Sequence, residues 1–297
     1  MSVPYAEVIG DPIEHSKSPL IHKFWLEQLG IEGDYRATRV TADELPAYLT
    51  ARRADPHWRG CNVTMPHKQA VISLLSAVAD DDIGAVNCIV PKAGGLIGHN
   101  TDAPGFIAAL RSTPSTGVSQ RANHVATYFH LIGAGGAARA VAAALRGYDI
   151  DYFNRDAAKA EAIADEFGPG RDYGAGHGLD ALGGSADYEY DPAFPDVKPN
   201  RGVDQRYSFI IVNASSMGMR GQPPVPIDLH TYPEDTLVCD LVYDPLETPL
   251  LRDARGLGMA TVDGLAFLIG QARLAFEHFF GVAPPAGDAE LRARLTS

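Results

Sequence analysis

One short segment of the sequence carries a lysine behind two small polar side chains, a combination that suits proton transfer to a hydroxylated ligand. Residues 62–68 read Asn-Val-Thr-Met-Pro-His-Lys, and Asn62 and Thr64 alternate, so they share one face of an extended chain. A lysine side chain is an ammonium at neutral pH, so it can supply a proton and a positive charge where an alkoxide develops. Lys68 is therefore a candidate proton donor, and an ordinary surface lysine is the alternative.

Other short polar side chains occur where strands are expected to end. Asn87 closes the run Gly-Ala-Val-Asn, and residues 100–102 read Asn-Thr-Asp. Each of these is an ordinary turn residue when it is taken singly. Asp102 adds a carboxylate as a partner for the Lys68 ammonium, and the whole set predicts one polar site.

A loop near the N-terminus carries two hydroxyl groups two residues apart. Residues 15–19 read His-Ser-Lys-Ser-Pro, and Pro19 is typical of the first turn of a helix. By this pattern Ser18 is most simply an N-cap, whose hydroxyl accepts a backbone hydrogen bond. Ser16 and Ser18 also offer their hydroxyl groups to a ligand at the start of that helix.

A glycine-rich turn follows an apolar strand and opens a helix. Residues 131–138 read Leu-Ile-Gly-Ala-Gly-Gly-Ala-Ala, which has the Gly-x-Gly-x-x-Ala form of the dinucleotide fingerprint. Gly133 permits the tight turn, Gly135 lets the backbone approach a pyrophosphate, and Ala138 lets the helix pack closely on the strand. A turn without a ligand is the alternative. The cofactor-binding residues expected here are Gly133, Ala134, Gly135, Gly136 and Ala137.

The end of the next expected strand bears on the choice of cofactor. An NAD-binding domain usually carries an acidic residue there for the ribose 2′-hydroxyl, whereas an arginine accommodates the 2′-phosphate of NADP. This chain has Asn154 and Arg155 at that place, and Lys159 lies one helical turn further on. NADP is therefore favoured. Asp156 opposes this preference because a carboxylate repels a phosphate, so NAD remains possible.

The elements that must position these residues indicate an α/β fold with two domains. We expect an N-terminal α/β substrate domain of residues 1–105 plus 262–297, and a Rossmann-type, doubly wound dinucleotide-binding domain of residues 106–261. A polar stretch covers residues 111–124, and the boundary is expected near residues 105–123. Residues 168–207 form an acidic, Gly/Pro-rich excursion with a helical piece at 179–182. Strands are expected at 125–132, 150–153, 209–213 and 237–240, helices at 104–110, 137–146, 157–167 and 265–280, and a glycine-rich turn at 92–98.

Composition excludes several classes of partner. The net charge is −12, with 25 basic and 37 acidic residues and no dense basic tract, which argues against nucleic acid. No apolar run approaches the length of a membrane span, and no secretory leader precedes the first strand. Three widely spaced cysteines indicate reduced thiols, and no metal site is suggested. We expect a cytoplasmic monomer or homodimer with a small-molecule substrate.

The chain resembles the shikimate dehydrogenase family, which includes shikimate/quinate dehydrogenases. The resemblance rests on motifs that follow one another in the family's order and approximate spacing. They are H-S-x-S-P, N-V-T-x-P-x-K, G-A-V-N, N-T-D, G-A-G-G-A-x-R, N-A-S-S, D-x-x-Y-x-P-x-x-T-P and D-G-L-x-x-L-x-x-Q. They cover nearly the whole chain outside residues 111–124 and 168–207.

The resemblance implies a set of site residues. Lys68 and Asp102 correspond to the family's catalytic pair. Ser16, Ser18 and Tyr243 would hold a substrate carboxylate, and Asn62, Thr64, Asn87, Asp102 and Gln271 would bind ring hydroxyls. Asn213, Ala214 and Ser215 would line the cofactor cleft, and Gly264 would close the nicotinamide pocket. Phe267 departs from the family's usual methionine and puts the packing at the nicotinamide in doubt.

The activity implied is the reversible, NADP-dependent reduction of 3-dehydroshikimate to shikimate in aromatic amino acid biosynthesis. One alternative is a quinate/shikimate dehydrogenase that prefers NAD. A second, of another class, is a non-catalytic nicotinamide-binding regulatory module, against which the presence of Lys68 and Asp102 argues. A third, a glutamyl-tRNA-reductase-like enzyme, requires an N-terminal nucleophilic cysteine, and Cys61 does not fit that position.

Overall fold

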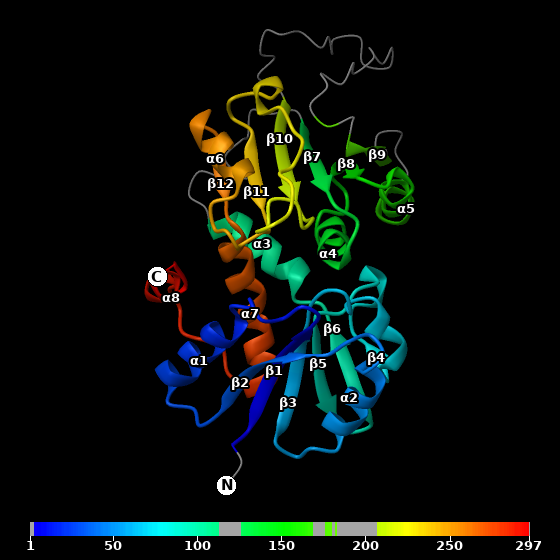
Figure 1. Ribbon diagram of the computed structural model, residues 1–297, viewed down its shortest axis with the longest axis vertical. Coiled ribbons are helices and arrows are strands. Elements are labelled where there is room, and N and C mark those ends of the chain that lie inside the picture. The colour runs from blue at the N-terminus through cyan, green and yellow to red at the C-terminus, as the bar shows by residue number, and fades with distance from the viewer. Residues whose placement is uncertain (1–2, 113–125, 169–175, 180–181, 183–206, 297) are drawn as a thin grey trace. The chain divides into compact units, whose positions relative to one another are not determined.

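The computed structural model describes residues 3–112, 126–168, 176–179, 182 and 207–296, and the chain divides into two compact units (Figure 1). The first unit comprises Met1–Ile107 and Phe267–Ser297, so it is built from both ends of the chain. The second unit is the continuous segment Ala108–Ala266. No helix in the described ranges is long and apolar enough to cross a membrane.

The first unit contains a mixed sheet with the strand order β2-β1-β3-β5-β6-β4. Its strands are β1 (Tyr5–Gly10), β2 (Asp34–Arg39), β3 (Trp58–Val63), β4 (Ala77–Val78), β5 (Cys88–Lys92) and β6 (Gly95–His99). β1 runs parallel to β2 and β3, whereas β5 runs antiparallel to β3 and β6. Because β3 and β5 are antiparallel neighbours, the end of β3 and the start of β5 meet at one edge of the sheet.

The turn expected at residues 92–98 is wrong over most of its length, because β6 begins at Gly95 and pairs with β5. The glycines there serve close packing. A Cβ at Gly95 would lie 1.8 Å from Ser76 Oγ, and a Cβ at Gly98 would lie 2.5 Å from a methyl group of Leu75. Leu96 between them is buried in the core. A run rich in glycine therefore forms a strand that a side chain at these positions would displace.

Helices complete the first unit. They are α1 (Ser18–Leu29), α2 (Leu45–Arg53), the start of α3 (Asp102–Ser112), most of α7 (Gly264–Phe280) and α8 (Ala289–Thr296), with 3-10 turns η1 (Ala70–Leu74) and η2 (Asp81–Ile83). A proline in its first turn begins α1, and Gly30 ends it with φ 62°. Ala275 and Phe279 of α7 join Ala6 and Val8 of β1 in one hydrophobic cluster. The C-terminal helix α7 is thus part of the core of the N-terminal sheet.

The second unit has a six-stranded parallel sheet with the order β12-β11-β10-β7-β8-β9. The strands are β7 (Ala126–Ile132), β8 (Asp149–Asn154), β9 (Gly176–Gly178), β10 (Tyr207–Asn213), β11 (Leu237–Asp240) and β12 (Ala260–Val262). Helices α4 (Gly136–Ala144), α5 (Ala157–Phe167) and α6 (Pro249–Gly256) and the 3-10 turn η4 (Leu229–Thr231) lie between them in sequence. Counted within the unit, this is the strand order of a Rossmann domain, whose ligands bind beyond the strand ends where the order reverses, here between β7 and β10.

Most of the acidic excursion at 168–207 lies outside the described residues. Within it, the structure describes β9 and two leucines, and Leu182 is buried against the core of the second unit. The helical piece expected at 179–182 includes two residues outside the described part. The polar stretch at 111–124 also lies outside the described residues, except for its first two residues, which end α3.

Candidate active site

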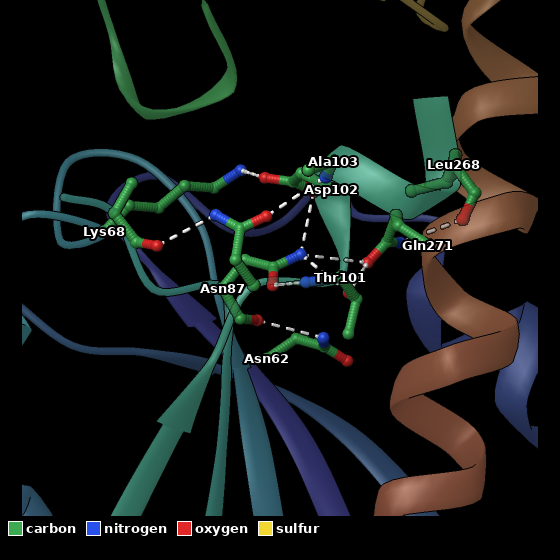
Figure 2. Close-up of polar contacts among 10 residues, drawn as sticks. Asn62, Lys68, Asn87, Thr101, Asp102, Ala103, Leu268 and Gln271 are labelled. Carbon is green, nitrogen blue, oxygen red and sulfur yellow. Dashed lines mark hydrogen bonds and ion pairs between the residues drawn. The ribbon is translucent and has the colours of Figure 1, made fainter. Parts of the chain in front are cut away.

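Lys68 and Asp102 form an ion pair in the first unit. Lys68 lies in the loop after β3, and Asp102 is the first residue of α3. Lys68 Nζ donates to Asp102 Oδ2 at 2.5 Å, and the two side chains are 15% and 3% exposed (Figure 2). A nearly buried carboxylate thus orients an ammonium group that solvent still reaches. This arrangement suits a group that gives and takes back a proton.

Asn87 holds the other oxygen of the same carboxylate. Its side-chain amide donates to Asp102 Oδ1 at 2.8 Å and to Thr101 Oγ1 at 2.9 Å, while its Oδ1 accepts from the Thr101 backbone N–H at 2.7 Å (Figure 2). Asn87 lies just before β5 and is buried. The Asp102 carboxylate is therefore fixed through both of its oxygens.

Gln271 reaches the same cluster from α7. Its Oε1 accepts from Thr101 Oγ1 at 3.4 Å, and its Nε2 donates to the Leu268 carbonyl at 2.8 Å (Figure 2). Two glycines allow this approach: a Cβ at Gly105 would lie 2.6 Å from the Gln271 backbone nitrogen, and a Cβ at Gly270 would lie 2.7 Å from the Gly105 carbonyl. Helices α3 and α7 therefore touch backbone to backbone beside the site.

Asn62 and Thr64 lie on either side of Val63, the last residue of β3. The Asn62 amide donates to the Asn87 carbonyl at 3.0 Å, which ties β3 to the start of β5. Thr64 is the first residue after the strand, and its backbone N–H donates to the Ile9 carbonyl at 2.9 Å. Asn62 thus joins the Lys68 cluster through Asn87.

The N-terminal hydroxyls lie at the start of α1. Ser18 is not an N-cap: the cap residue is Lys17, and Ser18 is the first residue of the helix. The Ser16 hydroxyl instead accepts from the Ser18 backbone N–H at 3.4 Å. Pro19 therefore occupies the second helical position instead of the first. Tyr243 belongs to the second unit, in the segment after β11, and burial raises the pKa of its hydroxyl.

The glycine turn after β7 fits the pyrophosphate of a dinucleotide. Gly133 has φ +119°, which favours glycine, and its backbone N–H donates to the Phe153 carbonyl at 2.8 Å. A Cβ there would lie 3.0 Å from the Ala214 carbonyl, so β7 and β10 come close at their ends. Around Gly135, the N-cap of α4, a Cβ would meet nothing within 4 Å. Gly136 and Ala137 then begin the helix whose N-terminus can receive a phosphate.

The end of β8 carries the charges expected for cofactor choice. Asn154 ends the strand, and its side chain donates to the Asp156 carbonyl at 3.1 Å. Arg155 is exposed. Lys159 Nζ lies 3.8 Å from Asp156 Oδ2, with both side chains more than half exposed. Asp156 thus competes with any anionic ligand for the Lys159 cation.

Asn213 shapes the loop after β10 instead of presenting its amide outward. Its Nδ2 donates to the Met217 carbonyl and to Asp240 Oδ1, each at 2.9 Å, and its Oδ1 accepts from the Ser215 hydroxyl at 2.6 Å. Ala214 continues this loop, and its N–H donates to the Ile132 carbonyl at 2.8 Å. These hydrogen bonds hold the backbone of this loop in place. This backbone lies beside the glycine turn.

Asp240, at the end of β11, connects this loop to α6. Its Oδ2 accepts from the Thr248 hydroxyl, the N-cap of α6, at 2.6 Å, and its Oδ1 accepts from the Val242 N–H at 3.0 Å and from Asn213. Burial raises the pKa of the Asp240 carboxyl to about 6, against the lowering effect of these donors. Sequence reasoning assigned Asp240 no role, although a carboxylate directly after a buried strand is a usable signal.

Gly264 and Phe267 occupy the first turn of α7. A Cβ at Gly264 would lie 2.3 Å from the Val242 carbonyl, so the helix starts in backbone contact with the segment after β11. Phe267, which stands where the family usually has methionine, is 8% exposed. Its ring is therefore packed within the protein.

Comparison with known proteins gives consistent results. The family model described as "Shikimate dehydrogenase substrate binding domain" matches residues 8–89. The chain is 49% identical to a shikimate dehydrogenase (NADP(+)) of Sphingopyxis alaskensis, over 99% of this chain and 97% of that protein. It is 34% identical to a shikimate 5-dehydrogenase of Thermus thermophilus, solved with NADP(H) and shikimate, with a TM-score of 0.78 over 99% and 100% of the two chains. A quinate dehydrogenase of Corynebacterium glutamicum in complex with NAD is 29% identical, with a TM-score of 0.73 over 99% and 97%.

Proposed function

The chain belongs to the shikimate dehydrogenase family, and we propose on this premise that it catalyses the reversible, NADP-dependent reduction of 3-dehydroshikimate to shikimate. The observation that carries the proposal is the Lys68–Asp102 pair, set among amide and hydroxyl groups in the first unit. A ketone that accepts hydride needs a proton for its oxygen, and an oriented ammonium group supplies one.

Each protein group then has a defined task. In reduction, Lys68 Nζ gives its proton to the oxygen of the ketone as that oxygen gains negative charge. In oxidation, the same nitrogen takes the proton of the hydroxyl back, and Asp102 orients it in both directions. A nicotinamide cofactor, when bound, supplies the hydride in reduction and accepts it in oxidation. Asn87 keeps the carboxylate in place throughout the cycle.

The assignment of the remaining residues is part of the proposal. The first unit would bind the substrate, through Ser16, Ser18, Asn62, Thr64, Asn87, Asp102 and Gln271, with Tyr243 contributed by the second unit. The second unit would bind NADP through residues 133–137, Asn154, Arg155, Lys159, residues 213–215 and Gly264. The open space around Gly135 and the close approach of Gly133 to Ala214 support this assignment.

A quinate/shikimate dehydrogenase that uses NAD is the second candidate. Asp156 favours it, because this carboxylate lies next to Arg155 and withdraws Lys159 from a 2′-phosphate. A likeness to a quinate dehydrogenase solved with NAD agrees with that alternative. One experiment separates the two: initial rates of oxidation of shikimate and quinate, each with NADP and with NAD. A higher kcat/KM for quinate with NAD than for shikimate with NADP would overturn the proposal.

The proposal extends to location and assembly. The three cysteines are free and buried, which suits a reducing compartment and supports the cytoplasm. We propose a monomer or a homodimer, and light scattering on the purified protein measures which of them forms.

A further inference from the structure

A buried hydrogen bond connects Tyr35 of β2 to Asn62, one of the polar residues of the candidate active site. The hydroxyl of Tyr35 donates to Asn62 Oδ1 at 2.6 Å, and both side chains are buried. The Asn62 amide nitrogen donates in turn to the Asn87 carbonyl at 3.0 Å. Tyr35 is thus two hydrogen bonds from Asn87, whose side chain holds Asp102.

The environment of Tyr35 makes its hydroxyl a hydrogen-bond donor to Asn62. Burial raises the pKa of the Tyr35 hydroxyl well above its ordinary value, so the group keeps its proton and acts as a donor. The ring stacks on the ring of His22 at a centroid distance of 3.9 Å and an interplanar angle of 8°. Phe279 of α7 packs beside it, with ring centroids 6.3 Å apart. The ring is held between helices and sheet, and its oxygen is directed at Asn62.

The hydrogen bonds of Asn62 explain why such a donor matters. The Asn87 carbonyl can only accept, so it requires the nitrogen side of the Asn62 amide. The oxygen side then faces the protein interior, where an unpaired carbonyl oxygen is unfavourable. Tyr35 supplies the missing donor. Without it, the amide loses one of the two contacts that hold it.

We propose that Tyr35 is a positioning residue for substrate binding that acts through Asn62. It touches neither the substrate nor the catalytic pair, and it keeps the Asn62 amide fixed where a ring hydroxyl binds. The inference rests on the proposed function, since it takes Asn62 as a substrate-binding group. It is separate from the proton transfer of Lys68, so its effect falls on KM and not on kcat.

The test is a double-mutant cycle of Tyr35→Phe, Asn62→Ala and the double variant, with shikimate and NADP. Tyr35→Phe keeps the stacked ring and removes only the hydroxyl, so we expect KM for shikimate to rise roughly 5- to 30-fold while kcat stays within about threefold. In the Asn62→Ala background the same change is expected to leave KM within about twofold, because the hydroxyl no longer has a group to position. Tyr152→Phe is the matched control, since its buried hydroxyl has no hydrogen-bond partner among the described residues and it lies in the second unit.

Thermal unfolding of each variant separates positioning from damage to the fold. The inference is overturned if Tyr35→Phe raises KM equally in the wild type and in the Asn62→Ala background. It is also overturned if Tyr35→Phe lowers kcat alone and does so together with a lower thermal stability. Wild-type protein that fails to oxidise shikimate would instead overturn the proposed function. The two failures are therefore distinct.

Discussion

Asn87 donates to Asp102 at 2.8 Å, on the carboxylate oxygen that Lys68 does not contact. The carboxylate therefore keeps a buried partner when the lysine is absent. Asn87 is itself held by the backbone N–H of Thr101. A substitution of Lys68 thus removes the proton donor without releasing Asp102. Its effect on activity can therefore be assigned to the lysine itself.

Lys68→Ala is expected to lower kcat roughly 10²- to 10⁴-fold, the usual range for a lost general acid or base. KM for NADP is expected to stay nearly unchanged, because Lys68 lies in the first unit. Steady-state kinetics measure both. Lys23→Ala is the control, since Lys23 is exposed and pairs with Asp34 at the surface. Turnover like that of the wild type in Lys68→Ala would remove the lysine from the mechanism.

Lys17→Met is expected to raise KM for shikimate about 3- to 10-fold with little change in kcat, since it loses one charge-assisted hydrogen bond. Lys17 lies between Ser16 and Ser18, and its Nζ donates to the Leu295 carbonyl of α8 at 2.5 Å. That bond anchors the hydroxyl loop to the C-terminal helix. Lys23→Met on the same helix is the comparison, and an equal effect from both variants would argue against the anchor.

Cofactor choice tests the charges at the end of β8. Arg155→Ala is expected to cost NADP about 1.5 to 3 kcal/mol in transition-state binding and to leave NAD almost untouched. Asp156→Thr is expected to improve NADP, because it removes a repulsive carboxylate and releases Lys159. The measurement is kcat/KM for both cofactors in wild type and both variants. Equal losses for NAD and NADP in Arg155→Ala would withdraw the assignment of Arg155 to the 2′-phosphate.

His22 predicts a dependence of stability on pH. Burial lowers the pKa of His22 to about 3, and neither ring nitrogen has a hydrogen-bond partner among the described residues. Because the unfolded chain binds a proton near the ordinary value of 6.5, this residue makes the fold less stable as the pH falls from there toward 3. The slope from this one group rises from about half of its full value at pH 6.5 to about 1.4 kcal/mol per pH unit at lower pH.

His22→Phe keeps the aromatic packing and removes this titration. Between about pH 6.5 and pH 5, the variant is expected to lose about 1.6 kcal/mol less unfolding free energy than the wild type. Any cost of the larger ring does not depend on pH. Urea unfolding at several pH values gives the two curves, and parallel curves would refute the prediction.

Local patterns predicted several elements of the second unit, but neither β9 nor α6. Helix α5 and strand β11 have the bounds expected from the sequence, because an amphipathic stretch and a short apolar run are signals contained within the element itself. The glycine turn at 133–136 is likewise recognisable, since its geometry depends on consecutive residues. The pairing of Lys68 with Asp102 was expected from residue types and from the resemblance, and the two side chains are in contact, while their catalytic role stays a prediction.

Contacts between distant segments that no motif marks could not be predicted. Tyr35 is a single aromatic residue in the strand Asp-Tyr-Arg-Ala-Thr-Arg, and only the pairing of β2 with β1 brings it near Asn62. The pairing of Lys17 with Leu295 joins the two ends of the chain. The periodicity of the sequence also does not show the order and direction of strands in a mixed sheet. The glycines of the β5–β6 hairpin therefore led to the prediction of a turn over residues that form a strand.

The core shared by β1 and α7 bears on how the protein is made. On the ribosome, residues 3–107 are synthesised before the second unit, whereas Ala275 and Phe279, which pack with β1 and β5, are synthesised after it. The continuous second unit has all of its strands before then, and domains fold as units during synthesis. The N-terminal sheet therefore lacks the packing of α7 until this later segment has been synthesised. A message that ended directly after Ala266 would thus yield the whole second unit attached to a first unit that lacks part of its core.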